Sequence, residues 1–164
     1  MRHISIDGVE VAELRPEHAR IYPRLRAADM EEARAASDMD PRAAIAYSIA
    51  SSRPGYAALL RGEPEVIFGA SPRPDGGGVP WLLATDEAQK HPVAFYRASK
   101  EYINEMREAY PYLENYVDAR NHLSIRWLKW AGFFVEPAEP GGVRGERFHR
   151  FWSGKGAGCG CVRL

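Results

Sequence analysis

Alternating apolar residues separated by turn residues predict strands at several points along the chain. In residues 3–13, apolar positions flank Asp7-Gly8, which is typical of a strand or a short hairpin. The β-prone runs on either side of Arg61-Gly62-Glu63 predict a second hairpin, because a short loop containing glycine joins them. Strands are therefore expected over residues 3–13, 56–61, 64–70, 79–85, 113–118, 133–136 and 146–152.

Apolar residues at helical spacing predict helices between these strands. Pro16-Glu17 opens the first helix, and Ile21, Leu25 and Ala28 form its apolar face. Asp29 and Ser37-Asp38 are suited to cap short helices that follow it.

The remaining helices have clearer boundaries. They are expected over residues 42–51, 92–109 and 121–131. Asp40-Pro41 is a start signal for the first of them, and Pro111 stops the second. Asn121 is expected to cap the third, and Gly132 to end it in a left-handed turn.

The order of these elements predicts an α/β (α+β) fold. A hairpin in the middle and strand–helix alternation afterwards favour a mixed, mostly antiparallel sheet with helices on both faces. Residues 79–85 are largely apolar, which is typical of a central strand covered on both sides. We expect one domain over residues 1–152 and a flexible glycine-rich tail over residues 153–164.

Composition narrows the class of protein. The chain has 164 residues, a length that suits one domain, and its 22 basic and 22 acidic residues give no net charge. Nucleic-acid binding is therefore disfavoured, and no apolar stretch is long enough to predict a membrane span. Cys159 and Cys161 make no disulfide framework, which indicates a reducing compartment, and no metal site is expected from their spacing to His149.

One block of sequence resembles a known family. Residues 121–133 read Asn-His-Leu-Ser-Ile-Arg-Trp-Leu-Lys-Trp-Ala-Gly-Phe, and this strand–Asn–helix–Gly-Phe arrangement is similar to that of the GCN5-related N-acetyltransferases. The element order resembles their fold up to about Trp152. The resemblance implies a V-shaped splay between strands 79–85 and 113–118, where the family's acetyl-CoA enters.

A narrower resemblance covers three segments. Residues 56–69, 81–86 and 113–133 look like the small internal virion (core) proteins of autographivirus-type podophages, which share the acetyltransferase-like fold. This resemblance implies a phage-encoded protein, located in the virion or the host cytoplasm, with other virion proteins as partners.

The catalytic equipment of the acetyltransferase family is incomplete in this sequence. That family holds pyrophosphate with a loop of the type R-x-x-G-x-G/A, whereas residues 85–92 contain no glycine and carry Asp86 and Glu87. The family's general acid is a tyrosine seven residues after the asparagine, and Leu128 stands there instead. We therefore expect a degenerate acetyl-CoA site, unless Tyr116 or a water donates the proton.

Candidate site residues follow from the same resemblance. The catalytic candidates are Glu114, Asp118 and His122, and the cofactor-binding candidates are Leu83, Thr85, Lys90, His91, Asn121 and Ser124. Each has an alternative, since a strand carboxylate is often only solvated and His122 fits an exposed first helical turn. The leading hypothesis is a structural or ejected virion protein that requires no cofactor. The alternative is an active acetyl-CoA-dependent N-acetyltransferase that acts on a protein or a small-molecule amine.

Overall fold

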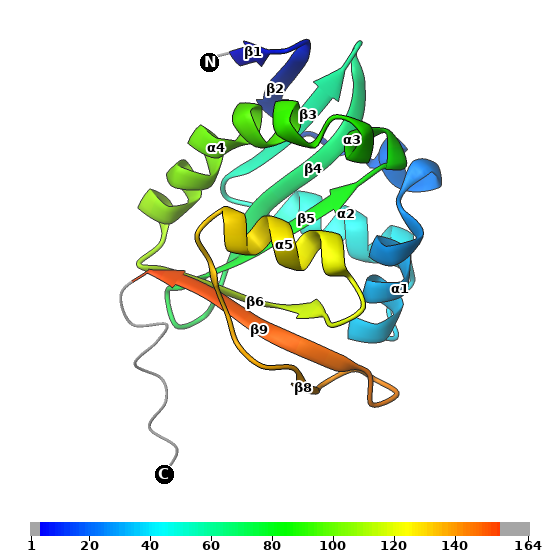
Figure 1. Ribbon diagram of the computed structural model, residues 1–164, viewed down its shortest axis with the longest axis vertical. Coiled ribbons are helices and arrows are strands. Elements are labelled where there is room, and N and C mark those ends of the chain that lie inside the picture. Colours follow the sequence, from blue (N-terminus) through cyan, green and yellow to red (C-terminus); the bar gives the residue numbers. More distant parts are fainter. Residues whose placement is uncertain (1–3, 155–164) are drawn as a thin grey trace.

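A mixed sheet of nine strands forms the centre of the computed structural model, which describes residues 4–154 (Figure 1). Its strands follow the order β1-β2-β3-β4-β5-β6-β9-β7, and β8 pairs with β9. The strands are β1 (Ile4–Ile6), β2 (Val9–Glu13), β3 (Gly55–Leu60), β4 (Glu63–Pro72), β5 (Gly78–Ala84), β6 (Tyr112–Asp118), β7 (Phe134–Val135), β8 (Glu139–Pro140) and β9 (Arg147–Gly154). Every pairing is antiparallel except that between β5 and β6, so the predicted mixed, mostly antiparallel sheet is confirmed.

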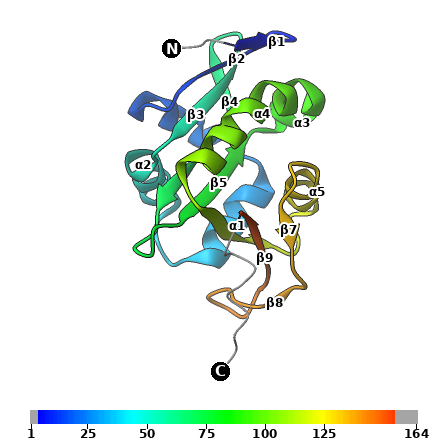
Figure 2. The ribbon, with the colours of Figure 1, turned by 90° about the vertical axis from the view of Figure 1, so that its left-hand side faces the viewer.

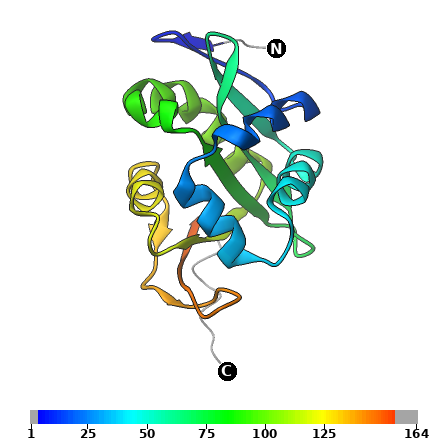
Figure 3. The same ribbon diagram turned by 90° about the vertical axis from the view of Figure 1, so that its right-hand side faces the viewer.

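Helices cover both faces of this sheet, as expected. Figures 2 and 3 show η1, α1 and α2 on one face and α3, α4 and α5 on the other. The helices are η1 (Pro16–Arg24), α1 (Ala27–Ala36), α2 (Pro41–Ser51), α3 (Asp86–Lys90), α4 (Pro92–Ala109) and α5 (His122–Trp130). None of these helices, which lie within residues 4–154, is long and apolar enough to cross a bilayer.

Alternation along β3 and β4 divides the apolar core between the two faces. Successive strand residues point to opposite sides, so Ala57 and Ile67 pack with η1 and α2, whereas Tyr56 and Phe68 pack with α4. Ile67 and Phe68 are almost completely buried, which identifies β4 as a central strand.

The sheet splays open between β5 and β6. These parallel strands pair only at Gly78 and Leu113, and this divergence confirms the V-shaped cleft expected there. Gly78 permits the close approach at the apex, because a Cβ atom there would lie 2.7 Å from the Tyr110 ring and 2.8 Å from Leu113. Strands β5 and β6 diverge from this point (Figure 1).

The region before α2 differs from its prediction. Residues 16–24 form a 3-10 helix that contains Pro23, and a proline inside a helix removes a backbone donor. Leu25 instead forms an isolated bridge with Thr85, and α1 starts afresh at Ala27. Asp29 lies inside α1 rather than capping it.

Two segments expected to be irregular are partly ordered. The segment after β5 forms the short helix α3, capped by Thr85. Strand β9 continues through Ser153 and Gly154, which pair with Leu113 and Tyr112. The other residues of the predicted tail, including Cys159 and Cys161, lie outside the described residues.

Both predicted boundaries of α5 are confirmed. The Asn121 Oδ1 atom accepts a hydrogen bond from the Ser124 amide at 3.4 Å. Gly132 has a φ of 86°, in the left-handed region that favours glycine. A Cβ atom at Gly132 would meet only the Arg107 guanidinium, at 3.5 Å, so backbone conformation rather than space requires glycine here.

Gly132→Val is expected to lower the free energy of unfolding by about 1–2 kcal/mol or more, because a β-branched residue resists the left-handed region. Urea denaturation followed by circular dichroism measures the change. Gly132→Asn is the matched control and should cost less, since asparagine tolerates positive φ. Equal stability of the valine variant and the parent would contradict this boundary.

Candidate functional site

Two cavities lie at the cleft between β5 and β6. The first, which we call the large cavity, has a volume of about 870 Å³. It begins at the cleft and continues into the space that α1 and α2 enclose with strands β6 and β9. Polar and aromatic side chains in its wall include Asp29, Glu32, Ser48, Trp81, Tyr116 and Arg150. A volume of this size suits a small-molecule ligand or part of a larger one.

The second, which we call the small cavity, has a volume of about 80 Å³ and lies on the opposite face, between α3, α4 and α5. Its wall is mainly apolar and includes Val66, Phe95 and Leu123. Leu82, Ser124 and Trp127 contribute to the walls of both cavities. The two cavities therefore approach each other across the cleft.

A buried ion pair stands where the cavities meet. The Arg26 Nε and Nη2 atoms donate to the two carboxylate oxygens of Asp29, at 3.0 and 2.5 Å, and the side chains are 4% and 3% exposed. Arg26 Nη2 also donates to Ser124 Oγ at 3.1 Å. The pair therefore links α1 to α5 across the cleft.

The same pair binds the open edge of β5. The Ala84 amide donates to Asp29 Oδ2 at 2.9 Å, and the Ala84 carbonyl accepts from the Arg26 amide at 2.9 Å. The Pro80 carbonyl accepts from Asn115 Nδ2 at 2.8 Å. Because backbone groups alternate in direction along a strand, those of Leu82 also point into the cleft. Part of the β5 edge is thus already occupied by side chains of the chain itself.

Glu32 is a titratable group that sequence reasoning missed. Its Oε2 atom accepts from the Asp118 amide at 3.0 Å and from Asn121 Nδ2 at 3.1 Å. Burial raises the pKa of Glu32 to about 7, and the neighbouring carboxylates Asp29 and Asp118 add to the shift. Among the residues described, Glu32 forms no ion pair with a cation. Such a carboxyl beside a cavity can exchange a proton near neutral pH.

The predicted catalytic residues lie elsewhere or are engaged. Glu114 forms an ion pair with Arg150 at 2.6 Å. Asp118 is buried, and its hydrogen bonds with Arg120 hold its pKa below the usual range, so it is an acceptor rather than a base near neutral pH. His122 is exposed and lines neither cavity.

Three of the predicted cofactor residues do lie around the cleft. Leu83 lines the large cavity, and Ser124 lines both. The buried Asn121 side chain caps α5 and donates to Glu32, and it also lies 3.4 Å from Asp29 Oδ1.

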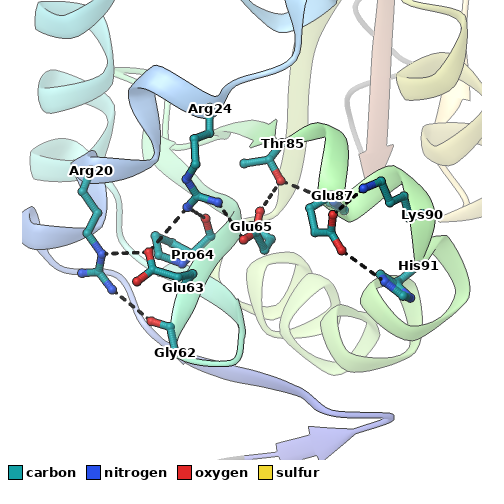
Figure 4. Close-up of polar contacts among 11 residues, drawn as sticks. Arg20, Arg24, Gly62, Glu63, Pro64, Glu65, Thr85, Glu87, Lys90 and His91 are labelled. Atoms are coloured by element: carbon teal, nitrogen blue, oxygen red, sulfur yellow. Dashed lines mark hydrogen bonds and ion pairs between the residues drawn. The ribbon is translucent and has the colours of Figure 1, made fainter.

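The predicted phosphate-binding residues are engaged with acidic partners (Figure 4). Thr85 Oγ1 accepts from the Ala88 amide at 3.3 Å and donates to the buried Glu65. Glu87 accepts from Lys90 at 2.8 Å and lies 3.5 Å from His91 Nε2. Lys90 and His91 are therefore exposed on the surface, and both lie beside the same carboxylate.

Leu128, at the family's general-acid position, and Tyr116, the alternative donor, differ in environment. Leu128 is buried in the core and 7% exposed, as its apolar side chain requires. Tyr116 is 52% exposed and lines the large cavity. Within residues 4–154, no cluster of three or more His, Cys, Asp or Glu side chains could hold a metal ion.

Comparisons with known proteins establish the fold. No family model and no curated protein sequence matches the chain. Ard1 from Thermoplasma volcanium superimposes with a TM-score of 0.70 and 15% identity, over 89% of this chain and 97% of that one. The ribosomal-protein-S5-alanine acetyltransferase from Vibrio fischeri gives 0.69 and 13%, over 96% and 98%.

A third structure is that of yncA, a putative acetyltransferase from Salmonella typhimurium with its cofactor acetyl-CoA. It superimposes with a TM-score of 0.69 and 15% identity, over 90% of this chain and 94% of that one. Coverage this complete shows that the chain has the fold of the GCN5-related N-acetyltransferases, as its sequence predicted. Sequence identities this low show a shared fold and do not show a shared activity.

Proposed function

Starting from this fold, we propose that the chain is a non-catalytic acetyltransferase-fold protein with a degenerate acetyl-CoA site, and that it serves as a structural or ejected component of a phage virion. The observation that carries the first part is the arrangement around Glu87. This carboxylate pairs with Lys90 and approaches His91, the two side chains expected to replace a phosphate loop. A pyrophosphate would have to displace Glu87 and lie beside Asp86.

The inner end of the cleft supports the same proposal. An extended cofactor arm between β5 and β6 needs the backbone groups of the β5 edge, and Asp29 already accepts from the Ala84 amide. The Arg26–Asp29 pair also stands in the passage between the two cavities. The residues present therefore do not fit acetyl-CoA without rearrangement of a buried ion pair.

The virion part of the proposal rests on the resemblance of residues 56–69, 81–86 and 113–133 to internal virion proteins. Other virion proteins are the partners this implies. Mass spectrometry of purified phage particles tests it, and the chain should be present in stoichiometric amounts after nuclease and protease treatment of the intact particles.

A second candidate function is an active N-acetyltransferase on a protein or small-molecule amine, and Glu32 is the observation that favours it. Its pKa of about 7 and its place in the wall of the large cavity suit a group that removes a proton from an amine. Tyr116, exposed in the same wall, is the available hydroxyl donor.

Acetyl-CoA is expected to bind with a dissociation constant of about 1 mM or weaker. Loss of two charge-assisted hydrogen bonds, each worth roughly 1.5–3 kcal/mol, moves a micromolar site into this range. Isothermal titration calorimetry on the full chain measures the constant. Glu87→Gln, which releases Lys90 and His91, should tighten binding, whereas Glu17→Gln, a change at an exposed glutamate in η1, should not.

A micromolar constant for the parent chain would contradict the degenerate site. Steady release of coenzyme A thiol with any amine acceptor would contradict the non-catalytic assignment and favour the enzyme. In that case the rate should rise as pH increases through about 7, the pKa of Glu32, and should fall strongly in Glu32→Gln.

A further inference from the structure

The Arg26 guanidinium has donors that the buried ion pair does not use. Its Nε and Nη2 atoms bind Asp29 and Ser124, which accounts for three of the five N–H groups that an arginine carries. Nη1 has no hydrogen-bond partner among residues 4–154, although Arg26 as a whole is only 3% exposed. Two donors of a charged side chain thus remain inside the molecule.

The free donors belong to a residue in the wall of the small cavity. Arg26 lines the small cavity and not the large one, whereas Asp29 lines the large cavity and not the small one. No fully buried side-chain nitrogen or oxygen in the described residues lacks a partner, so Nη1 keeps some accessible surface. Because Nε and Nη2 point toward Asp29, Nη1 lies on the opposite edge of the planar group, and the small cavity is the one that Arg26 lines.

The rest of the small cavity combines apolar walls with two hydroxyls. Val66, Phe95 and Trp127 belong to the wall, as do the hydroxyl-bearing residues Ser99 and Ser124. Ser124 Oγ accepts from Arg26 and so retains its own proton for donation. An apolar pocket with a few converging polar groups is the usual form of a small-ligand site.

Size and charge restrict the ligand. A volume of about 80 Å³ is too small for a phosphorylated compound, and a cationic donor repels amines. The exposed residues Gln89 and Pro92 form part of the wall, so the cavity opens to solvent between α3 and α5.

We propose that the small cavity binds a free short-chain carboxylate of two to four carbons. The carboxylate accepts from Arg26 Nη1 and from the Ser124 hydroxyl, and the alkyl chain packs against Phe95 and Trp127. Arg26 then bridges two carboxylates, that of Asp29 on one edge and that of the ligand on the other. The small cavity lies at the cleft where acetyl-CoA would enter, so acetyl-CoA bound there would compete with the carboxylate for this site.

Titration of the ¹⁵N-labelled full chain with sodium propionate, followed by NMR at constant ionic strength, tests the proposal. We expect saturable shifts of the Ala84, Ala88 and Ser124 amides with a dissociation constant in the range of about 1–10 mM, as suits a ligand of a few heavy atoms. Propionamide, which has the same shape and no charge, should bind about tenfold more weakly.

Two variants separate this site from nonspecific binding. Ala88→Leu fills the small cavity without touching the ion pair and should abolish the saturable shifts, whereas Ala44→Leu, in the wall of the large cavity, should leave them unchanged. Arg26→Lys keeps a cation beside Asp29 but removes Nη1, and should weaken binding about tenfold. The proposal is overturned by a folded parent chain without saturable shifts, by equal affinity for propionamide, or by unchanged affinity in Ala88→Leu.

Discussion

Asp29→Ala is expected to lower the free energy of unfolding by about 3–5 kcal/mol, because it leaves the Arg26 guanidinium buried without its partner. The same change removes the acceptor of the Ala84 amide at the edge of β5. Chemical denaturation followed by circular dichroism and tryptophan fluorescence measures the loss. A marginally stable domain would be largely unfolded by a change of this size.

Two further variants make this result specific. Asp75→Ala removes an exposed carboxylate that pairs with Arg73 at 3.3 Å, and should change stability little, since solvent screens that pair. Replacing both members of the buried pair, as Arg26→Met with Asp29→Leu, should restore much of the loss because no charge is left uncompensated. An Asp29→Ala chain as stable as its parent would show that Arg26 reaches solvent more easily than its burial indicates.

Glu32→Gln is expected to stabilise the protein at pH 8 and to have little effect at pH 5. Burial raises the pKa of Glu32 from 4.5 to about 7, so the folded state holds this proton more tightly than the unfolded state. The stability that this proton contributes is complete below pH 4.5 and is lost as pH rises to about 7. The shift corresponds to roughly 3 kcal/mol, which is an upper limit for the gain in the variant.

Thermal unfolding of the parent and the variant across this pH range measures the effect. The glutamine oxygen can still accept from the Asp118 amide and Asn121, so the variant keeps the hydrogen bonds of Glu32. Glu31→Gln, at the exposed neighbour in α1, is the matched control and should not alter the pH dependence. The prediction would be contradicted if the difference in stability between the parent and the variant were the same at pH 5 and at pH 8.

Local signals in the sequence predicted much of the fold. Asp40 and Asn121 were identified as helix caps because a capping side chain bonds within three residues of itself. Gly132 was assigned correctly for the same reason, since positive φ is a property of one residue. The short helix α3 and the 3-10 form of η1 were missed, because five residues give little periodicity and Pro23 interrupts an otherwise helical pattern.

The centre of the site could not be predicted in this way. Asp29 is of a residue type that commonly caps helices, yet it accepts a hydrogen bond from the Ala84 amide, 55 residues away. Arg26 likewise donates to Ser124, 98 residues away. Whether these polar residues are buried depends on how α1 packs over the cleft, which no local pattern encodes. The available signal was the spacing of Asp29 and Glu32, which places both carboxylates on one face of a helix.

The single pairing between Gly78 and Leu113 also determines how the molecule holds together. Beyond this pairing the ladder of backbone hydrogen bonds is interrupted at the cleft, so we expect strands β1 to β5 and strands β6, β9 and β7 to protect their amides from hydrogen exchange as two separate units. Side chains join these units across the gap, through the contacts of Arg26 with Ser124 and of Glu32 with the Asp118 amide. Substitutions at these side chains would therefore let the two units exchange their amides independently while each ladder stays intact.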